Sequence, residues 1–240
     1  MRLRAAAVLV AAPLAVQVLA AEAPDPLAVS ALEKFLARPA IARQYCASRS
    51  LEASGGGQRG WIEVKTSFAP ASGFAYQVTS EGGSGYIRRR VLRSLLDEEQ
   101  RLLALRSTNA AITAANYRFR PGGLTDEGLA VIALQPLRKD RSLIVGQMLL
   151  TRDEGQLVRL EGRLAKSPSF WVSRVDVVRS YRSVNGVFLP VSLQTSAQLR
   201  LLGSSKLGMT YRYSEVDERT VSEGGAGPQD GATPESCAGV

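Results

Sequence analysis

The chain has 240 residues and a formal net charge of +8, and 25 of its 30 basic residues are arginine. It contains no histidine, which excludes nucleophiles activated by histidine and every metal site with histidine ligands. Arginine makes forked contacts with carboxylate or phosphate, so the positive charge allows an anionic partner. The alternative is an arginine-rich composition without a binding role, because the charges are spread along the chain.

The first 20 residues have the layout of a secretory signal peptide. Arg2 and Arg4 precede an uncharged apolar run that ends in small residues, so we predict cleavage after Ala20. The alternative is a membrane anchor, but the run is short for a span and Pro13 interrupts it. We therefore expect a periplasmic protein with no integral membrane segment in its mature form. Nucleic acid is not an expected partner of an exported chain without a basic motif.

The two cysteines, Cys46 and Cys237, would meet oxidising conditions after export. A disulfide between them is allowed but is not required by the sequence, because Cys237 lies in a glycine-rich segment of low apolar content. We predict a single domain over residues 21–217 and a disordered tail over residues 218–240.

The first predicted elements are a helix and a β-hairpin. Residues 25–37 carry apolar side chains at helical spacing, and Pro39 ends the segment, which predicts a short amphipathic helix. Residues 61–68 form a strand pattern, the sequence PASG makes a turn, and alternation resumes over residues 74–78. This arrangement predicts two antiparallel strands.

The strongest helical pattern covers residues 85–105, and Arg93 with Asp97 and Asp97 with Arg101 are spaced to form ion pairs on its exposed side. Its predicted apolar side consists of the stripe Ile87, Val91, Leu95 and Leu102, with Leu92, Leu96 and Leu103 beside it. Arginines crowd the N-terminal half, where the helix dipole disfavours cations. An anionic headgroup at these arginines would explain their position; the alternative is a solvated helix face.

The stretch GGSGY at residues 82–86 leads into this helix and fits no phosphate-binding or nucleophile motif. Its backbone amides could hold an anion, and the alternative is a hinge. The carboxylates at 97–99 and 153–154 are predicted on a polar helix side and in a hairpin turn, where burial does not tune their pKa values. The sequence therefore predicts no catalytic residue, no metal and no cofactor, and thus a protein that is not an enzyme.

Almost every segment from residue 117 to residue 213 has the pattern of a strand or a turn. Asn185-Gly186 is a hairpin signal, because both residues tolerate the positive backbone angles of a tight turn. Residues 189–201 then alternate between apolar and polar side chains. Consecutive strands joined by short turns predict an antiparallel meander, and the few helices would leave part of its apolar face uncovered. The concave side of such a sheet either encloses a cavity or is packed with the protein's own side chains. The hydrophobic periodicity of the strands is the same in both cases and does not distinguish them.

Residues 173–198, SRVDVVRSYRSVNGVFLPVSLQTSAQ, combine a long strand, an Asn-Gly hairpin, an aliphatic-proline step and a second alternating strand. This order resembles LolA-like proteins, the periplasmic carriers and sorting proteins of outer-membrane lipoproteins, most clearly over residues 157–216. The resemblance implies an α+β fold in which a curved antiparallel sheet forms an incomplete β-barrel and helices cover its concave face. It also implies a hydrophobic interior that accepts acyl chains, with an acylated protein or lipid and an inner- or outer-membrane transport protein as partners.

Two functions are consistent with these features of the sequence. The leading hypothesis is a periplasmic carrier or binder of a hydrophobic, lipid-linked ligand; the alternative is a non-enzymatic envelope interaction or sensor module that binds a protein partner with the same fold. The expected apolar lining consists of Ile62, Val64, Tyr76, Val131, Val175, Val177, Val191, Leu193 and Leu199. Arg88, Arg89 and Arg90 are expected to meet an anionic headgroup at the rim.

Overall fold

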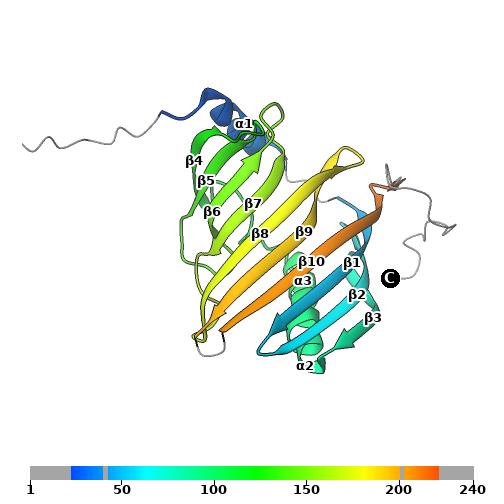
Figure 1. The fold of residues 1–240 in the computed structure, drawn as a ribbon. Coiled ribbons are helices and arrows are strands. Elements are labelled where there is room, and N and C mark those ends of the chain that lie inside the picture. The colour runs from blue at the N-terminus through cyan, green and yellow to red at the C-terminus, as the bar shows by residue number, and fades with distance from the viewer. Residues whose placement is uncertain (1–22, 40–42, 201–202, 222–240) are drawn as a thin grey trace, which may run out of the picture.

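The computed structural model describes residues 23–39, 43–200 and 203–221 (Figure 1). The strands are β1 (Tyr45–Gly55), β2 (Gln58–Ala69), β3 (Gly73–Gly83), β4 (Tyr117–Leu124), β5 (Ala130–Pro136), β6 (Ile144–Leu150), β7 (Leu157–Leu164), β8 (Val172–Val184), β9 (Val187–Leu199), β10 (Gly203–Val216) and β11 (Arg219–Thr220). They form one antiparallel sheet in the order β3-β2-β1-β10-β9-β8-β7-β6-β5-β4, and β11 pairs with β10. The sheet is open, and the predicted fold class is confirmed.

Helix α1 (Pro26–Ala37) covers the β4–β6 part of the sheet. It begins where predicted, because Asp25 accepts a hydrogen bond from the amide of Leu27 at 2.8 Å and Pro26 occupies the first helical position. Ala28 and Ala31 are fully buried against the sheet. The amide of Asp25 also donates to Gly122 of β4, which attaches the start of the helix to the sheet edge.

The second helical segment consists of α2 (Gly85–Ile87), the π-helical turn η1 (Arg88–Arg93) and α3 (Ser94–Ala104), and it packs on β1, β2 and β3. Its buried side chains are Ile87, Leu92 and Leu96, separated by five residues and then four. A π-turn adds one residue to a helical turn and so shifts the buried stripe. The helix is where it was predicted. Ile87 of the predicted stripe and the flanking Leu92 and Leu96 are buried, while Val91 and Leu95 pack against the core at partial burial.

The two ion pairs predicted along this helix are also wrong. Asp97 accepts a hydrogen bond from the Tyr76 hydroxyl of β3 at 2.5 Å, Arg93 pairs with Glu81, and Arg101 pairs with Glu98 at 2.6 Å. Asp97 and Arg93 thus have partners on the neighbouring strand, and Arg101 has a partner three residues away in the same helix, instead of the predicted partners four residues away. The helix is therefore oriented by polar contacts to β3 as well as by its apolar side.

The two ends of the chain carry three further predictions. Residues 1–20, the predicted signal peptide, lie outside the described residues, as does most of the predicted tail. The start of that tail differs from the prediction, because β11 pairs with Glu215 and Val216 of β10. Cys46 is disulfide-bonded, and Cys237, its predicted partner, lies outside the described residues.

The Asn185-Gly186 turn is confirmed. Asn185 has a φ of 51° and Gly186 a φ of 80°, and Val184 pairs with Val187 across the turn. β1 has no counterpart among the predicted elements. Its inward-facing positions include Arg49 between Ala47 and Leu51, and this charged residue interrupts the apolar alternation that identifies the other strands.

Two glycines allow neighbouring strands to approach closely in the middle of the sheet. Gly146 of β6 and Gly162 of β7 are directly paired, and a Cβ on either one would overlap the backbone of the other strand. Glycine at such a contact has no side chain to place between the strands. This pair lies between the part of the sheet under α1 and the long strands β8–β10.

We expect Gly146→Ala to lower the free energy of unfolding by about 1–3 kcal/mol, because the strands must separate to admit the methyl group. Gly208→Ala is the matched control, since a Cβ at that strand position meets no atom within 4 Å. Urea unfolding of both variants measures the difference. Equal stabilities would contradict the close approach of the two strands.

Candidate functional site

A hollow of about 630 Å³ lies on the face of the sheet that carries the helices, which we call the inner face. It is enclosed by the C-terminal end of α1, the middle of α3, the ends of β1 and β2, and the β8–β9 hairpin. We call it the inner hollow. It is lined by Arg38, Pro39, Arg43, Tyr45, Phe68, Glu99, Leu103, Gln156, Gly186, Val187, Phe188 and Leu189.

A buried guanidinium lies beside the inner hollow. Arg49 of β1 is 1% exposed, and it donates hydrogen bonds to the Glu99 carboxylate at 2.7 and 3.2 Å and to the Tyr45 hydroxyl at 2.8 Å. Its guanidinium carbon is 4.7 Å from the ring centre of Tyr211 and 5.0 Å from that of Phe74. Aromatic faces attract cations, and the attraction is stronger when water is excluded. Burial opposes the charge, but the Glu99 carboxylate outweighs it and holds the pKa of Arg49 above its ordinary value.

Arg179 of β8 places a second guanidinium next to this cluster, near Tyr181 and Tyr211. Its Nε atom is buried without a hydrogen-bond partner. Among the ion pairs of the described residues, Glu99 pairs with Arg49 and none includes Arg179. Arg179 is hydrogen-bonded with Tyr181 and feels the charge of Glu99, which is already paired with Arg49, so the two guanidinium groups outnumber the carboxylates of this cluster.

The rim of the inner hollow adds a cation at the end of α1. Arg38 donates to the carbonyl of Gly155 at 3.0 Å, to the side-chain oxygen of Gln156 at 2.7 Å and to the carbonyl of Glu154. All three acceptors are neutral, so these contacts orient the guanidinium without cancelling its charge. Arg43, in contrast, pairs with the Asp217 carboxylate at 2.7 Å.

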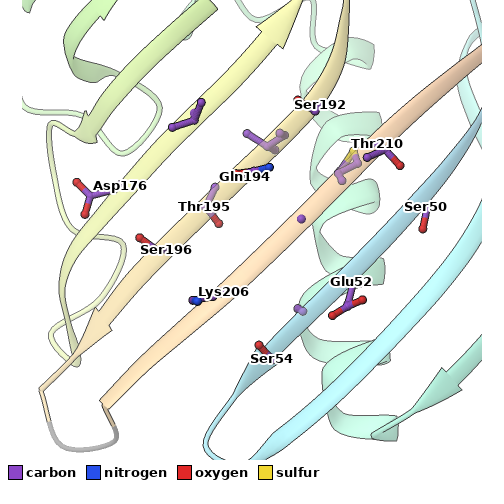
Figure 2. A pocket seen from close by; sticks show the side chains of 15 residues that line it. Ser50, Glu52, Ser54, Asp176, Ser192, Gln194, Thr195, Ser196, Lys206 and Thr210 are labelled. Atoms are coloured by element: carbon purple, nitrogen blue, oxygen red, sulfur yellow. The ribbon is translucent and has the colours of Figure 1, made fainter.

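A second hollow, of about 610 Å³, lies on the outer face across β1, β10, β9 and β8 (Figure 2). Its side chains form rows across paired strands, for example Ser54, Lys206, Ser196 and Asp176. Gly208 leaves a gap in the middle row. Asp176 pairs with Arg174, and Glu52 pairs with Arg59. The outer hollow lacks aromatic side chains, whereas Tyr45, Phe68 and Phe188 line the inner hollow, so the inner hollow is the better candidate for an apolar ligand.

The structure distributes the predicted lining residues differently from the expectation. Ile62, Val64, Val177 and Leu193 are buried in the main core, and Tyr76 and Val175 pack against it. Val191 and Leu199 are partly buried. None of them lines the inner hollow. Ile62, Val64 and Tyr76 lie on β2 and β3, which the segment α2–η1–α3 covers, and the other five lie on β8 and β9.

The prediction that the side chain of Val131 faces inward is wrong. Its neighbours Ala130 and Ile132, and Leu134 beyond them, are buried in the core, so alternation turns Val131 toward the outer face.

The predicted headgroup arginines do not reach the inner hollow. Arg88 and Arg93 both pair with Glu81 of β3, and the hydrogen bond from Arg93 is the main cause that lowers the pKa of Glu81. Arg89 and Arg90 are exposed. This group belongs to the contact between the helix and the edge strand, so the headgroup role is not supported at this position.

Sequence reasoning missed Tyr45, Arg49, Phe68, Glu99 and Leu103. They come from two strands and a helix that are far apart in the chain, and no local motif connects them. The one available signal was Arg49 itself, a charged residue flanked by alternating apolar positions, because a buried arginine requires a carboxylate partner.

Comparisons with known proteins give only distant structural similarities. No protein-family model matches the chain, and no curated protein matches it. Among solved structures, a DUF1329 family protein from Desulfovibrio piger has a TM-score of 0.36 and 9% identity, covering 83% of this chain and 92% of that one. A LolA superfamily protein, NE2245 from Nitrosomonas europaea, has a TM-score of 0.34 and 14% identity, covering 82% and 95%. MucB has a TM-score of 0.25 and 12% identity, covering 78% and 92%.

These neighbours include the family that residues 173–198 resemble. Similarity at this level assigns neither ligand nor partner. Within residues 23–39, 43–200 and 203–221, no group of cysteine and acidic side chains is arranged to hold a metal ion. In the same ranges, no helix has the length and apolar character needed to cross a membrane.

Tyr45 allows a test of the buried cluster through pH. Burial raises the pKa of its hydroxyl to about 12, partly opposed by the charge of Arg49 and reinforced by that of Glu99. An unfolded tyrosine titrates at about 10, so between these values the folded chain keeps a proton that the unfolded chain has lost. The Tyr45 contribution to stability is therefore complete below pH about 10 and is lost as the pH rises toward 12.

Between pH 10 and 12, we expect the free energy of unfolding to fall less steeply with pH in Tyr45→Phe than in the wild type. The difference in slope should be up to about 1.4 kcal/mol per pH unit. Urea unfolding across this range measures the slope. The wild-type and variant slopes should coincide below pH about 9. Identical slopes at high pH would show that this hydroxyl is not buried as described.

Proposed function

We propose that the protein binds a single amphiphile, an apolar chain with an anionic group, in the inner hollow. The observation that carries this proposal is an apolar-lined hollow next to guanidinium groups that lack enough carboxylate partners. The proposal keeps the hydrophobic, lipid-linked ligand of the leading hypothesis and moves its site from the middle of the sheet to the end near the β8–β9 hairpin.

The size and lining of the hollow support one ligand of moderate size. Its volume of about 630 Å³ lies within the range of roughly 300–1,000 Å³ that is typical of small-molecule sites. Phe68 and Leu103 provide apolar surface, and Tyr45 stacks on Phe68 with ring centres 5.9 Å apart. Each methylene of a bound chain would contribute about 0.8 kcal/mol by leaving water.

The charge distribution supports an anionic group on that ligand. Arg38 lies at the rim with neutral partners only, and Glu99 in the wall is already engaged by Arg49. An anion near Arg38 would complete a charge-assisted contact that the described residues leave open. Export to the periplasm, which the first 20 residues predict, would bring the protein into contact with such lipids.

The proposal is tested by binding of a fluorescent fatty acid and of the matching fatty alcohol. We expect Leu103→Trp to fill part of the hollow and to weaken binding of both probes by at least about tenfold. Leu105→Trp is the matched control: it is 64% exposed, does not line the hollow, and should bind like the wild type.

Arg38→Gln should weaken binding of the acid by about tenfold and leave binding of the alcohol nearly unchanged. Arg90→Gln, an exposed arginine of η1, should affect neither probe. No probe uptake by the folded wild type would refute the proposal. The alternative, a module that binds a protein segment, would then become the better explanation, and crosslinking in periplasmic extract would identify that segment.

A further inference from the structure

A different surface lies at the other end of the strands, away from the inner hollow and independent of the proposed function (Figure 1). Residues 137–143 connect β5 to β6, and residues 165–171 connect β7 to β8. The two loops are adjacent, because the amide of Ala165 donates to the carbonyl of Leu143 at 2.8 Å. The amide of Arg200 donates to the carbonyl of Trp171 at 2.9 Å and joins the end of β9 to them. We call these three segments the loop-end surface.

Large apolar side chains point into solvent from this surface. Phe170 is 71% exposed and Trp171 is 59% exposed, and their rings meet edge to face with centres 5.5 Å apart. Leu137 on the adjacent loop is 49% exposed. β8 begins at Val172 and leaves both aromatic residues outside the sheet. Exposed apolar side chains grouped in one place mark a contact surface.

Basic side chains lie on the same three segments as these aromatic residues. The three segments contain five exposed basic side chains and one carboxylate, that of Asp140. The guanidinium carbon of Arg200 lies 4.6 Å from the ring centre of Phe170. Hydrogen bonds from Ser142 lower the pKa of Asp140, and the charges of Arg138 and Lys166 act in the same direction. The basic residues are Arg138, Lys139, Arg141, Lys166 and Arg200.

We propose that the loop-end surface adsorbs to anionic lipid bilayers, with Phe170 and Trp171 in the headgroup region and the five cations against lipid phosphates. Tryptophan is enriched where membranes meet water, because its ring is apolar and its N–H remains hydrated. Basic residues next to it add attraction to anionic lipids. The positive charge of the loop-end surface favours an anionic bilayer as the partner. Lipid phosphates can neutralise the five cations directly, so no folded partner with a matching acidic patch is required.

Vesicle flotation tests the proposal. The wild-type protein should float with vesicles that contain phosphatidylglycerol and remain unbound with vesicles of phosphatidylcholine alone, and added salt should release it. The double variant Phe170→Ser/Trp171→Ser should lose binding by at least about tenfold, as should Lys166→Glu/Arg200→Glu. Tyr86→Ser is the matched control, because Tyr86 is 63% exposed at the start of α2, and it should float like the wild type. The wild type and all variants are prepared with the same first and last residue, so that they differ only at the substituted positions.

Tryptophan fluorescence gives a second measurement that does not depend on stability of the variants. The chain has two tryptophans, so Trp61→Phe leaves Trp171 as the one reporter. Its emission should shift to the blue on phosphatidylglycerol vesicles. Equal binding to neutral vesicles, flotation without a blue shift, or unchanged flotation of the Phe170/Trp171 variant would each overturn the proposal. A vesicle-free dimer that produces the same blue shift would also overturn it, since a second copy would then cover the surface.

Discussion

The buried guanidinium of Arg49 determines how the sheet and helix α3 fit together. It projects from the middle of β1 toward α3, and its charge requires a partner because an isolated buried cation is strongly unfavourable. Glu99 supplies that partner from the helix, and Tyr45 supplies a further acceptor from the same strand. The aromatic rings around the guanidinium exclude water from the pair. The position of α3 across β1–β3 follows from this interaction together with the buried side chains Leu92 and Leu96.

The same arrangement leaves the inner hollow open. α1 covers β4–β6, and η1 with α3 covers β1–β3, while the long strands β8–β10 extend between them. Two helical segments are too few to cover a sheet of this width. The uncovered part lies where Leu103 faces the β8–β9 hairpin, and it combines apolar surface with excess positive charge. A protein core normally avoids that combination, and a binding site uses it.

Much of the fold could be predicted from the sequence, because strand alternation, Asn185-Gly186 and the Asp25 cap are local signals. β1 could not, since Arg49 interrupts its pattern and its partner Glu99 lies 50 residues away. The apolar side of the 85–105 helix could be predicted, but which of its residues are fully buried could not, because a π-turn is not visible in a 3.6-residue period.

The site was harder to predict for a related reason. Periodicity identifies the inward side of a strand but not what covers it, so it predicts Ile62 and Val64 as cavity lining although α3 and η1 bury them completely. Val131 shows the limit within a strand: in the apolar run Ala130-Val131-Ile132, alternate residues face opposite sides, and composition does not indicate which side is inward. The residues that line the inner hollow are far apart in the sequence and become neighbours only in the folded chain.

Native mass spectrometry of the protein purified without detergent is the sharpest test of the inner hollow as a binding site, because it weighs the protein together with any ligand that remains bound. We expect one amphiphile per chain in the wild type and in Leu105→Trp, and none in Leu103→Trp. A folded wild-type protein that carries no ligand, even after incubation with anionic lipid, would show that the inner hollow does not bind an amphiphile.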